Sequence, residues 1–203
     1  MKILLTSTGF YAQKVKEKFL SMTTESTQKY KVGIITTASP EKEHNMFAIK
    51  AKTDFLSMGF TNIEFIDIEF DNPDKLLDKD IIYINGGNPF HLLFHIRNNH
   101  IDYILKNMQS KNTIIIGVSA GALIFCPNIK IVDFFTPQLN DIGLKDLSSL
   151  KFTDSFIFPH YGREDLFPDD ENKSIDDRIE EFETLENCSV QRMNEKQWKY
   201  INL

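Results

Sequence analysis

The sequence predicts an α/β fold in three layers, with a mostly parallel sheet between helices on both faces. Short apolar runs that are typical of buried strands alternate along the chain with stretches of helical periodicity. This alternation gives βαβ units, and because their crossovers share one hand, helices cover both faces of the sheet. The chain has 203 residues, 41% of them hydrophobic, without a repeat or a linker, so we expect a single domain over residues 1–203.

The first half of the chain supplies four strands and two helices. Each predicted strand is a short run dominated by Ile, Leu, Val or Phe, and turn-forming residues such as Ser-Thr-Gly or Ala-Ser-Pro follow the first two. Each predicted helix carries apolar residues every three or four positions, and a glycine ends the second one. The strands are expected at residues 2–6, 31–37, 63–68 and 80–85, and the helices at 10–22 and 41–58.

Paired glycines follow the fourth predicted strand, in the segment 85–89 (Asn-Gly-Gly-Asn-Pro). Asn88 can cap the next helix and Pro89 suits its first turn, so we expect a helix that runs from there toward residue 108. The glycines let the backbone approach another group closely or adopt positive φ. Taken alone, the segment is better explained as a plain strand-to-helix turn, but beside a nucleophile the N–H of Gly87 becomes a donor to an oxyanion.

The segment 114–122 (Ile-Ile-Ile-Gly-Val-Ser-Ala-Gly-Ala) joins a buried strand to the motif Gly-x-Ser-x-Gly. The motif alone also occurs in ordinary loops, but a strand before it and a helix after it indicate a nucleophile elbow. Gly117 and Gly121 are needed there because a side chain would collide with the neighbouring strand or helix. Ser119 is then held in the open with backbone N–H groups behind it, as acyl transfer requires.

A histidine ends the predicted strand at 156–160 (Phe-Ile-Phe-Pro-His). Functional groups of parallel sheets gather at the carboxyl ends of the strands, so we expect His160 to lie at the same edge as Ser119. A neutral imidazole within hydrogen-bond reach can accept the proton of the serine hydroxyl. The alternative is a histidine that makes only a structural hydrogen bond at the end of a strand.

Three acidic residues are candidates to orient that imidazole: Asp133, Asp141 and Glu164. Asp133 follows the serine in the order nucleophile, acid, base, and it lies in an apolar stretch where a carboxylate must be paired. We therefore favour Asp133. All three remain open, since each is equally explained as a solvated surface acid.

No metal or organic cofactor is expected. His91 and His95 have the spacing of a zinc peptidase helix, but Leu92 stands where such a helix carries glutamate. The two cysteines, Cys126 and Cys188, are too few for a disulfide framework. We expect Cys126 to be a packed thiol on the helix that follows the elbow.

The charge of the chain limits its partners. A formal net charge of -6 argues against nucleic acid or an anionic membrane, because both favour basic surfaces. The chain turns polar after a few apolar residues at its start, too soon for a signal peptide, and no later run approaches the length of a membrane span. We therefore expect a cytoplasmic protein, monomeric or homodimeric.

Together these segments resemble the peptidase E (aspartyl dipeptidase) family of serine peptidases, which also includes cyanophycinase. The paired glycine and elbow segments are more specific at this separation than either is alone. The likeness extends from Met1 to about Arg178. It is carried by residues 85–93, 117–122, 126–129 and 159–162.

The resemblance implies a flavodoxin-like fold akin to class I glutamine amidotransferases, with serine in place of their cysteine. It implies Ser119 as nucleophile, His160 as base and an oxyanion hole formed by the backbone of Gly87 and Ala120. The implied reaction is hydrolysis of a short peptide through an acyl-enzyme, without a cofactor. In aspartyl dipeptidases the substrate has an N-terminal aspartate.

Two departures from the family pattern bear on specificity and on the acid. The family's acidic residue aligns near Phe134, one place from Asp133. Aspartate-specific members use an arginine where Ile175 stands here, and Arg163 or Arg178 are the possible substitutes. A catalytically impaired binding homologue and an esterase are the alternative functions. An α/β-hydrolase esterase usually has a longer chain and a larger gap between nucleophile and histidine.

Overall fold

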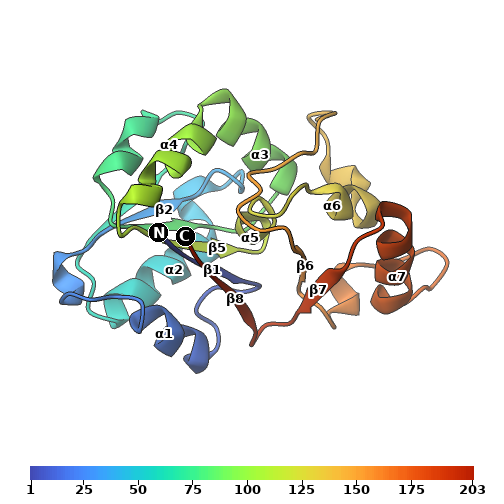
Figure 1. The fold of residues 1–203 in the computed structure, drawn as a ribbon, viewed down its shortest axis with the longest axis horizontal. Coiled ribbons are helices and arrows are strands. Elements are labelled where there is room, and N and C mark those ends of the chain that lie inside the picture. Colours follow the sequence, from blue (N-terminus) through green and yellow to red (C-terminus); the bar gives the residue numbers. More distant parts are fainter.

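A six-stranded sheet forms the centre of the computed structural model, which describes residues 1–203 except for the side chain of Ser110 (Figure 1). The strand order is β3-β2-β4-β5-β1-β8; the first five strands are parallel and β8 runs antiparallel to β1. No helix in the described part of the chain is long and apolar enough to cross a membrane. The strands are β1 Lys2–Thr6, β2 Lys31–Ile35, β3 Asn62–Ile66, β4 Ile81–Ile84, β5 Ile114–Val118 and β8 Trp198–Asn202.

Helices cover both faces of this sheet, which confirms the predicted fold class. Figure 1 shows α3 and α4 on one side of the strands and α1 and α2 on the other. Alternation along β1 explains the two layers: Ile3 and Leu5 pack in the cluster beneath α3 and α4, whereas Leu4 packs beneath α1 and α2. The helices are α1 Gln13–Leu20, α2 Met46–Ser57, α3 Pro89–Asn98 and α4 Ile101–Asn107.

The strand order differs from that of flavodoxin-like folds in the place of β1. In those folds the first strand lies between the second and the third. Here β1 lies between β5 and β8. The first strand therefore stands directly beside the strand that leads into the serine motif.

A second, two-stranded sheet lies beside the first. Its strands β6 and β7 are parallel, and apolar residues of α6 and α7 pack with them in a separate cluster. The prediction that the run at 156–160 belongs to the edge of the large sheet is wrong. Strand β8 occupies the free side of β1, so this run pairs with β7 instead. The elements of this part are α5 Ala120–Leu123, α6 Lys130–Phe135, β6 Phe156–Pro159, α7 Ile175–Glu186 and β7 Val190–Met193.

Two predicted helices are interrupted. The helix expected from Pro89 toward residue 108 ends at Asn98, and a new helix begins after His100, whose φ is 55°. The helix expected at 41–58 begins as a 3-10 turn and continues as α2 only after Asn45, whose side chain accepts from the N–H of Phe47. In each case the apolar periodicity runs on without a break, but a helix cap or a residue with positive φ divides the segment into two helical pieces.

Candidate active site

Ser119 directly follows strand β5 and so lies at the carboxyl edge of the large sheet. The backbone of Ser119 has φ 51° and ψ -111°, and α5 begins at the next residue. Its N–H donates to the carbonyl of Thr6 at 2.9 Å, which ties the turn to the end of β1. A non-glycine residue in such a region costs on the order of 1–3 kcal/mol and is typical of functional sites. The sharp strand-to-helix turn predicted from the motif is thus present.

Both motif glycines are required by close packing, as predicted. A Cβ atom at Gly117 would lie 2.4 Å from the carbonyl oxygen of Gly121. A Cβ at Gly121 would lie 2.2 Å from the carbonyl oxygen of Ile84 in β4. The start of α5 therefore rests directly on the main chain of two adjacent strands, and this contact determines the position of Ser119.

The paired glycines after β4 form the neighbouring wall. A Cβ at Gly86 would lie 3.7 Å from the hydroxyl oxygen of Ser119, so this loop passes against the nucleophile. Gly87 has φ 144°, and a Cβ there would lie 2.2 Å from the carbonyl oxygen of Ala38. Asn88 caps α3 by accepting from the N–H groups of Phe90 and His91, which confirms the predicted cap.

The first turn of α5 carries backbone N–H groups next to the serine. Helix N-termini leave their first N–H groups without an intrahelical acceptor, and Ala120 is the first residue of this helix. The expected donors, Gly87 and Ala120, therefore belong to the two backbone segments that flank Ser119.

His160 reaches the nucleophile from the small sheet. It follows β6 directly, has φ 60°, and places its Nε2 2.9 Å from the Oγ of Ser119. Its side chain is half-buried. The structure thus brings together the two residues that the sequence analysis paired, although they stand on different sheets.

The carboxylate of Glu195 lies next to the other nitrogen of the His160 imidazole. Its Oε1 lies 3.1 Å from His160 Nδ1, and its Oε2 is buried without a hydrogen-bond partner in the described structure. The nearest arginine, Arg163, has its Nη1 3.9 Å from Oε1. An Nδ1–H that donates to this carboxylate leaves Nε2 free to accept the serine proton.

The three acids expected at the imidazole lie elsewhere. Asp141 pairs with Nε2 of His91 at 2.8 Å, and Glu164 accepts from the first N–H of α7. Asp133 is half-buried on α6, and no hydrogen bond joins it to His160 in the described structure. The prediction that Asp133 orients the imidazole is wrong. Glu195 lies at Nδ1 instead, because the turn after β7, and not helix α6, faces that nitrogen.

Sequence reasoning missed Glu195 because it assigned no structure beyond Arg178. The signal available was the short segment Val-Gln-Arg-Met at 190–193, a polar turn, and the alternating segment Trp-Lys-Tyr-Ile-Asn at 198–202. This pattern is typical of two strands joined by a tight connection. Glu195 lies in that connection, and it becomes a candidate to orient the imidazole once the second strand is known to lie beside β1.

Burial shifts the pKa of two further residues singled out in the sequence, His95 and Cys126. Burial lowers the pKa of His95, whose Nε2 lies 3.9 Å from Glu69. Cys126 is buried as expected, although α5 ends three residues before it, and burial raises the pKa of its thiol to about 12. Cys188 is a free, half-buried thiol. No group of three or more His, Cys, Asp or Glu residues could hold a metal ion among the residues described.

Both candidate specificity arginines are already engaged. Arg178 is buried; its two terminal nitrogens donate to the carbonyls of Phe135 and Phe167, each at 3.0 Å, and it stacks on the ring of Phe135. Arg163 forms two hydrogen bonds to Asp165, at 2.8 and 2.6 Å. Arg178 is thus held inside the protein, whereas Arg163 is an exposed side chain paired with the neighbouring Asp165.

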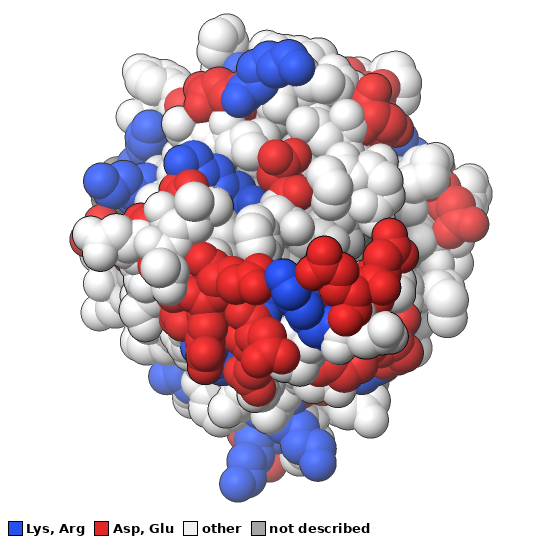
Figure 2. Space-filling view, turned by 90° about the vertical axis from the view of Figure 1, so that its right-hand side faces the viewer, with Lys and Arg blue, Asp and Glu red and all other residues white. Residues whose placement is uncertain are grey.

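Acidic side chains gather on the end of the molecule that carries α7. Figure 2 shows this end with a broad area of Asp and Glu and few basic groups between them. The segment 163–186 contains eleven acidic and three basic residues. This segment directly follows the turn of His160 in the sequence.

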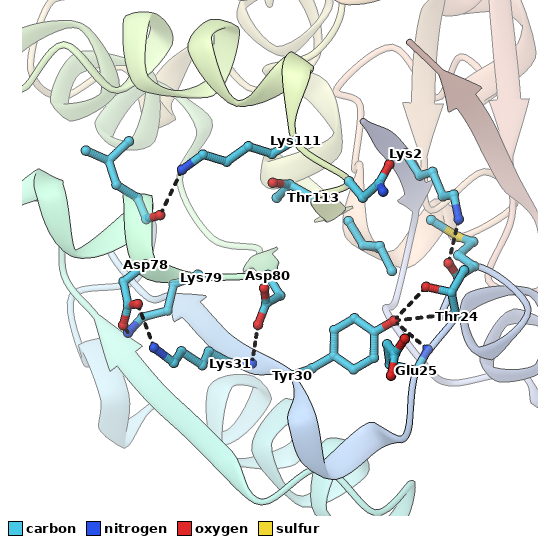
Figure 3. Close-up of a pocket in the computed structure, with 14 residues that line it drawn as sticks. Lys2, Thr24, Glu25, Tyr30, Lys31, Asp78, Lys79, Asp80, Lys111 and Thr113 are labelled. Carbon is cyan, nitrogen blue, oxygen red and sulfur yellow. Dashed lines mark hydrogen bonds and ion pairs between the residues drawn. The ribbon is translucent and has the colours of Figure 1, made fainter.

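The opposite, amino-terminal edge of the large sheet holds a cavity of about 600 Å³ (Figure 3). Lys2 and Lys111 lie on its wall but reach away from each other, and each donates to a main-chain carbonyl. Lys31 pairs with Asp78. The lysine side chains therefore do not converge on one point, and the reactive groups lie at the carboxyl edge.

Comparisons with known proteins match the chain to peptidases of one family. The profile of Peptidase family S51 matches residues 3–202. An uncharacterized peptidase of Pasteurella multocida is 30% identical over 138 residues, 66% of each chain, and one of Listeria monocytogenes is 30% identical over 134 residues, 64% of this chain and 65% of its own. The matched stretch thus spans just under two thirds of these curated relatives. Peptidase E of Nostoc is 24% identical over 176 residues, 87% of this chain and 68% of its own.

Solved structures show the same fold. A crystal structure of a candidate peptidase E protein from Listeria monocytogenes superposes with a TM-score of 0.72 at 24% identity, over 100% of this chain and 98% of that one. A peptidase from an acI-B1 Actinobacterium gives a TM-score of 0.64 at 18% identity, over 100% and 87% of the two chains. Both likenesses concern the fold alone.

Proposed function

The chain belongs to peptidase family S51, and from this premise we propose that it is a serine peptidase that hydrolyses short peptides. The observation that carries the proposal is one continuous chain of hydrogen bonds. Ser119 Oγ lies 2.9 Å from His160 Nε2, and His160 Nδ1 lies 3.1 Å from Glu195. This is the arrangement of nucleophile, base and orienting acid that acyl transfer uses on many unrelated folds.

In the proposed reaction His160 takes the proton of Ser119 as the hydroxyl oxygen attacks the peptide carbonyl. The N–H groups of Gly87 and Ala120 donate to the developing oxyanion, a contribution of roughly 3–4 kcal/mol per donor in a comparable site. The imidazolium then protonates the leaving amine as the C–N bond breaks. Water, deprotonated by the same imidazole, releases the acyl group and restores Ser119. Glu195 holds the imidazole in one tautomer throughout.

We further propose that the enzyme does not select an N-terminal aspartate. Arg178 is held by two carbonyls inside the protein, and Arg163 is paired with Asp165 at the surface. The acidic segment 163–186 also repels a substrate carboxylate. Peptides with a neutral or basic N-terminal residue should therefore be hydrolysed faster than those that begin with aspartate.

The decisive experiment combines Ser119→Ala with a fluorophosphonate probe. We expect the native protein to be labelled at Ser119 and to hydrolyse short peptides, and the variant to do neither while its thermal unfolding is unchanged. A folded variant that keeps full peptidase activity would refute the role of Ser119. Native protein that is neither labelled nor active on peptides would indicate a catalytically impaired binding homologue.

A panel of dipeptides with N-terminal Asp, Glu, Ala and Lys tests the specificity separately. The expected order of kcat/KM places Ala and Lys above the two acidic residues. An enzyme that cleaves only the Asp dipeptide would contradict the proposed specificity and leave the catalytic assignment intact. Turnover of p-nitrophenyl esters without any turnover of peptides would instead favour an esterase.

A further inference from the structure

The loop that follows β1 connects the two sheets of the active site. Ser7 is 1% exposed, and its hydroxyl donates to the carbonyl of Met193 at the end of β7 at 2.8 Å. The same oxygen accepts from the backbone N–H of His160, just after β6, at 3.2 Å. One buried hydroxyl therefore joins the large sheet to the ends of both strands of the small sheet.

The surroundings of this hydroxyl add to the same connection. Thr8 donates its hydroxyl to the carbonyl of Glu195 at 3.3 Å. The N–H of Tyr161 donates to the carbonyl of Met193 at 3.2 Å, so the turn of the histidine and the end of β7 are bonded to each other as well. The loop after β1 therefore forms hydrogen bonds to the main chain of both His160 and Glu195.

The need for such a connection follows from the topology. Ser119 lies on the large sheet, whereas His160 follows a strand of the small one, and in the described structure β6 pairs with β7 alone. Among the described residues, no ladder of backbone hydrogen bonds between β6 and the large sheet sets the distance between the two reactive side chains. His160 also has φ 60°, a conformation that the rest of the structure must hold in place.

We propose that Ser7 is a positioning residue, whose hydroxyl sets the place of His160 relative to Ser119. This inference rests on the proposed function. Ser7 does not contact the reacting atoms; it acts through the backbone of His160 and through the carbonyl that precedes the turn of Glu195. Loss of the hydroxyl frees the His160 N–H and lets the small sheet shift against the serine.

A purely structural hydroxyl would behave differently. Removing it would lower stability, but molecules that remain folded would turn over substrate at the native rate. A positioning hydroxyl affects the folded molecule itself, because a displacement of the base by ~1 Å costs on the order of 10²-fold in rate. Substrate binding does not depend on that displacement, so kcat should fall while KM stays near its native value.

The test compares Ser7→Ala with Ser149→Ala. Ser149 is a matched control, since its hydroxyl also donates to a distant main-chain carbonyl, that of Ile124, and makes no described hydrogen bond to Ser119, His160 or Glu195. Each protein is followed by thermal unfolding, by the rate of fluorophosphonate labelling of Ser119, and by kcat and KM on the best dipeptide. Ser7→Cys, which keeps the volume with a weak hydrogen-bonding group, serves if Ser7→Ala does not fold.

We expect the Ser7 variant to label about 10- to 100-fold more slowly than native protein and to lose kcat by a similar factor at unchanged KM. Ser149→Ala should match native protein in both. A folded Ser7 variant that labels and turns over at the native rate would overturn the inference. So would an equal loss in Ser149→Ala. If native protein itself is not labelled, the proposed function fails, which is a distinct result.

Discussion

Replacing Glu195 with Gln removes the charge opposite His160 while keeping the length of the side chain. Glu195 Oε1 lies 3.1 Å from Nδ1 and Oε2 is buried without a partner, so the imidazole is the main hydrogen-bonding partner of this carboxylate in the described structure. In Glu195→Gln, either the amide oxygen or the amide nitrogen can face Nδ1. The nitrogen, a donor, forces the proton onto Nε2 and so removes the base that Ser119 requires.

These two orientations set the bounds of the effect. With the amide oxygen at Nδ1 the tautomer survives, and the loss is that of a hydrogen bond to a charged group, about 1.5–3 kcal/mol. That free energy corresponds to roughly 10- to 150-fold in rate. With the amide nitrogen at Nδ1 the tautomer is wrong, and in a comparable triad this costs about 10⁴ in kcat. We expect Glu195→Gln to lose about 10- to 10⁴-fold in kcat/KM, with KM little changed.

The assay is steady-state hydrolysis of a dipeptide, with the rate of fluorophosphonate labelling as a second measure and thermal unfolding as the check on folding. Asp133→Asn is the matched control, because it removes the acid that the sequence favoured, on a helix that does not bond to the imidazole. It should keep the native rate. If Glu195→Gln keeps the native rate, or Asp133→Asn loses as much as Glu195→Gln, then the orienting role of Glu195 is wrong.

Further predictions concern packing, ionisation and specificity. Gly121→Ala should lower the free energy of unfolding by about 3 kcal/mol or more in urea titrations, because its Cβ would lie 2.2 Å from the carbonyl oxygen of Ile84; native-like stability would contradict that contact. Burial raises the pKa of Cys126 from 9.0 to about 12, so the folded protein should not react there with a disulfide reagent at pH 8. The neutral Cys126 thiol contributes its full share to the free energy of unfolding below pH 9, and this share is lost as the pH rises toward 12. Comparing the unfolding of native protein and Cys126→Ala at pH 8 and at pH 10 measures this loss. Arg178→Met should lower the free energy of unfolding by about 2–5 kcal/mol, because two carbonyls lose their donor, yet leave the ratio of Asp to Ala dipeptide turnover unchanged; an altered ratio would place this residue in the substrate site.

The large sheet and the elbow are predictable because their signals are local. A run such as Ile114 to Ile116 is apolar enough to require burial on both faces, and the glycines beside Ser119 are required by contacts with the adjacent chain segments. The cap at Asn88 is equally local, because the residues that it bonds are two and three positions away. In each case a few consecutive residues carry the whole physical argument.

The acid at the imidazole is not predictable in the same way. Its position depends on the pairing of β8 with β1 and of β7 with β6, and these contacts join residues far apart in the sequence. Asp133 is the more attractive choice from spacing alone, but no spacing rule states which helix faces Nδ1. The break of the long predicted helix at His100 has a different origin, since it depends on one left-handed residue within an otherwise helical pattern.

The placement of the acid after β7 has a consequence for the growing chain. During synthesis the ribosome adds Glu195 35 residues after His160, and β7, the strand before Glu195, pairs with β6, the strand before His160. A nascent polypeptide therefore contains the proposed nucleophile and base before it contains the acid proposed to orient the imidazole. If the proposed function holds, a chain that stops before Glu195 should hydrolyse peptides more slowly than the chain that includes it.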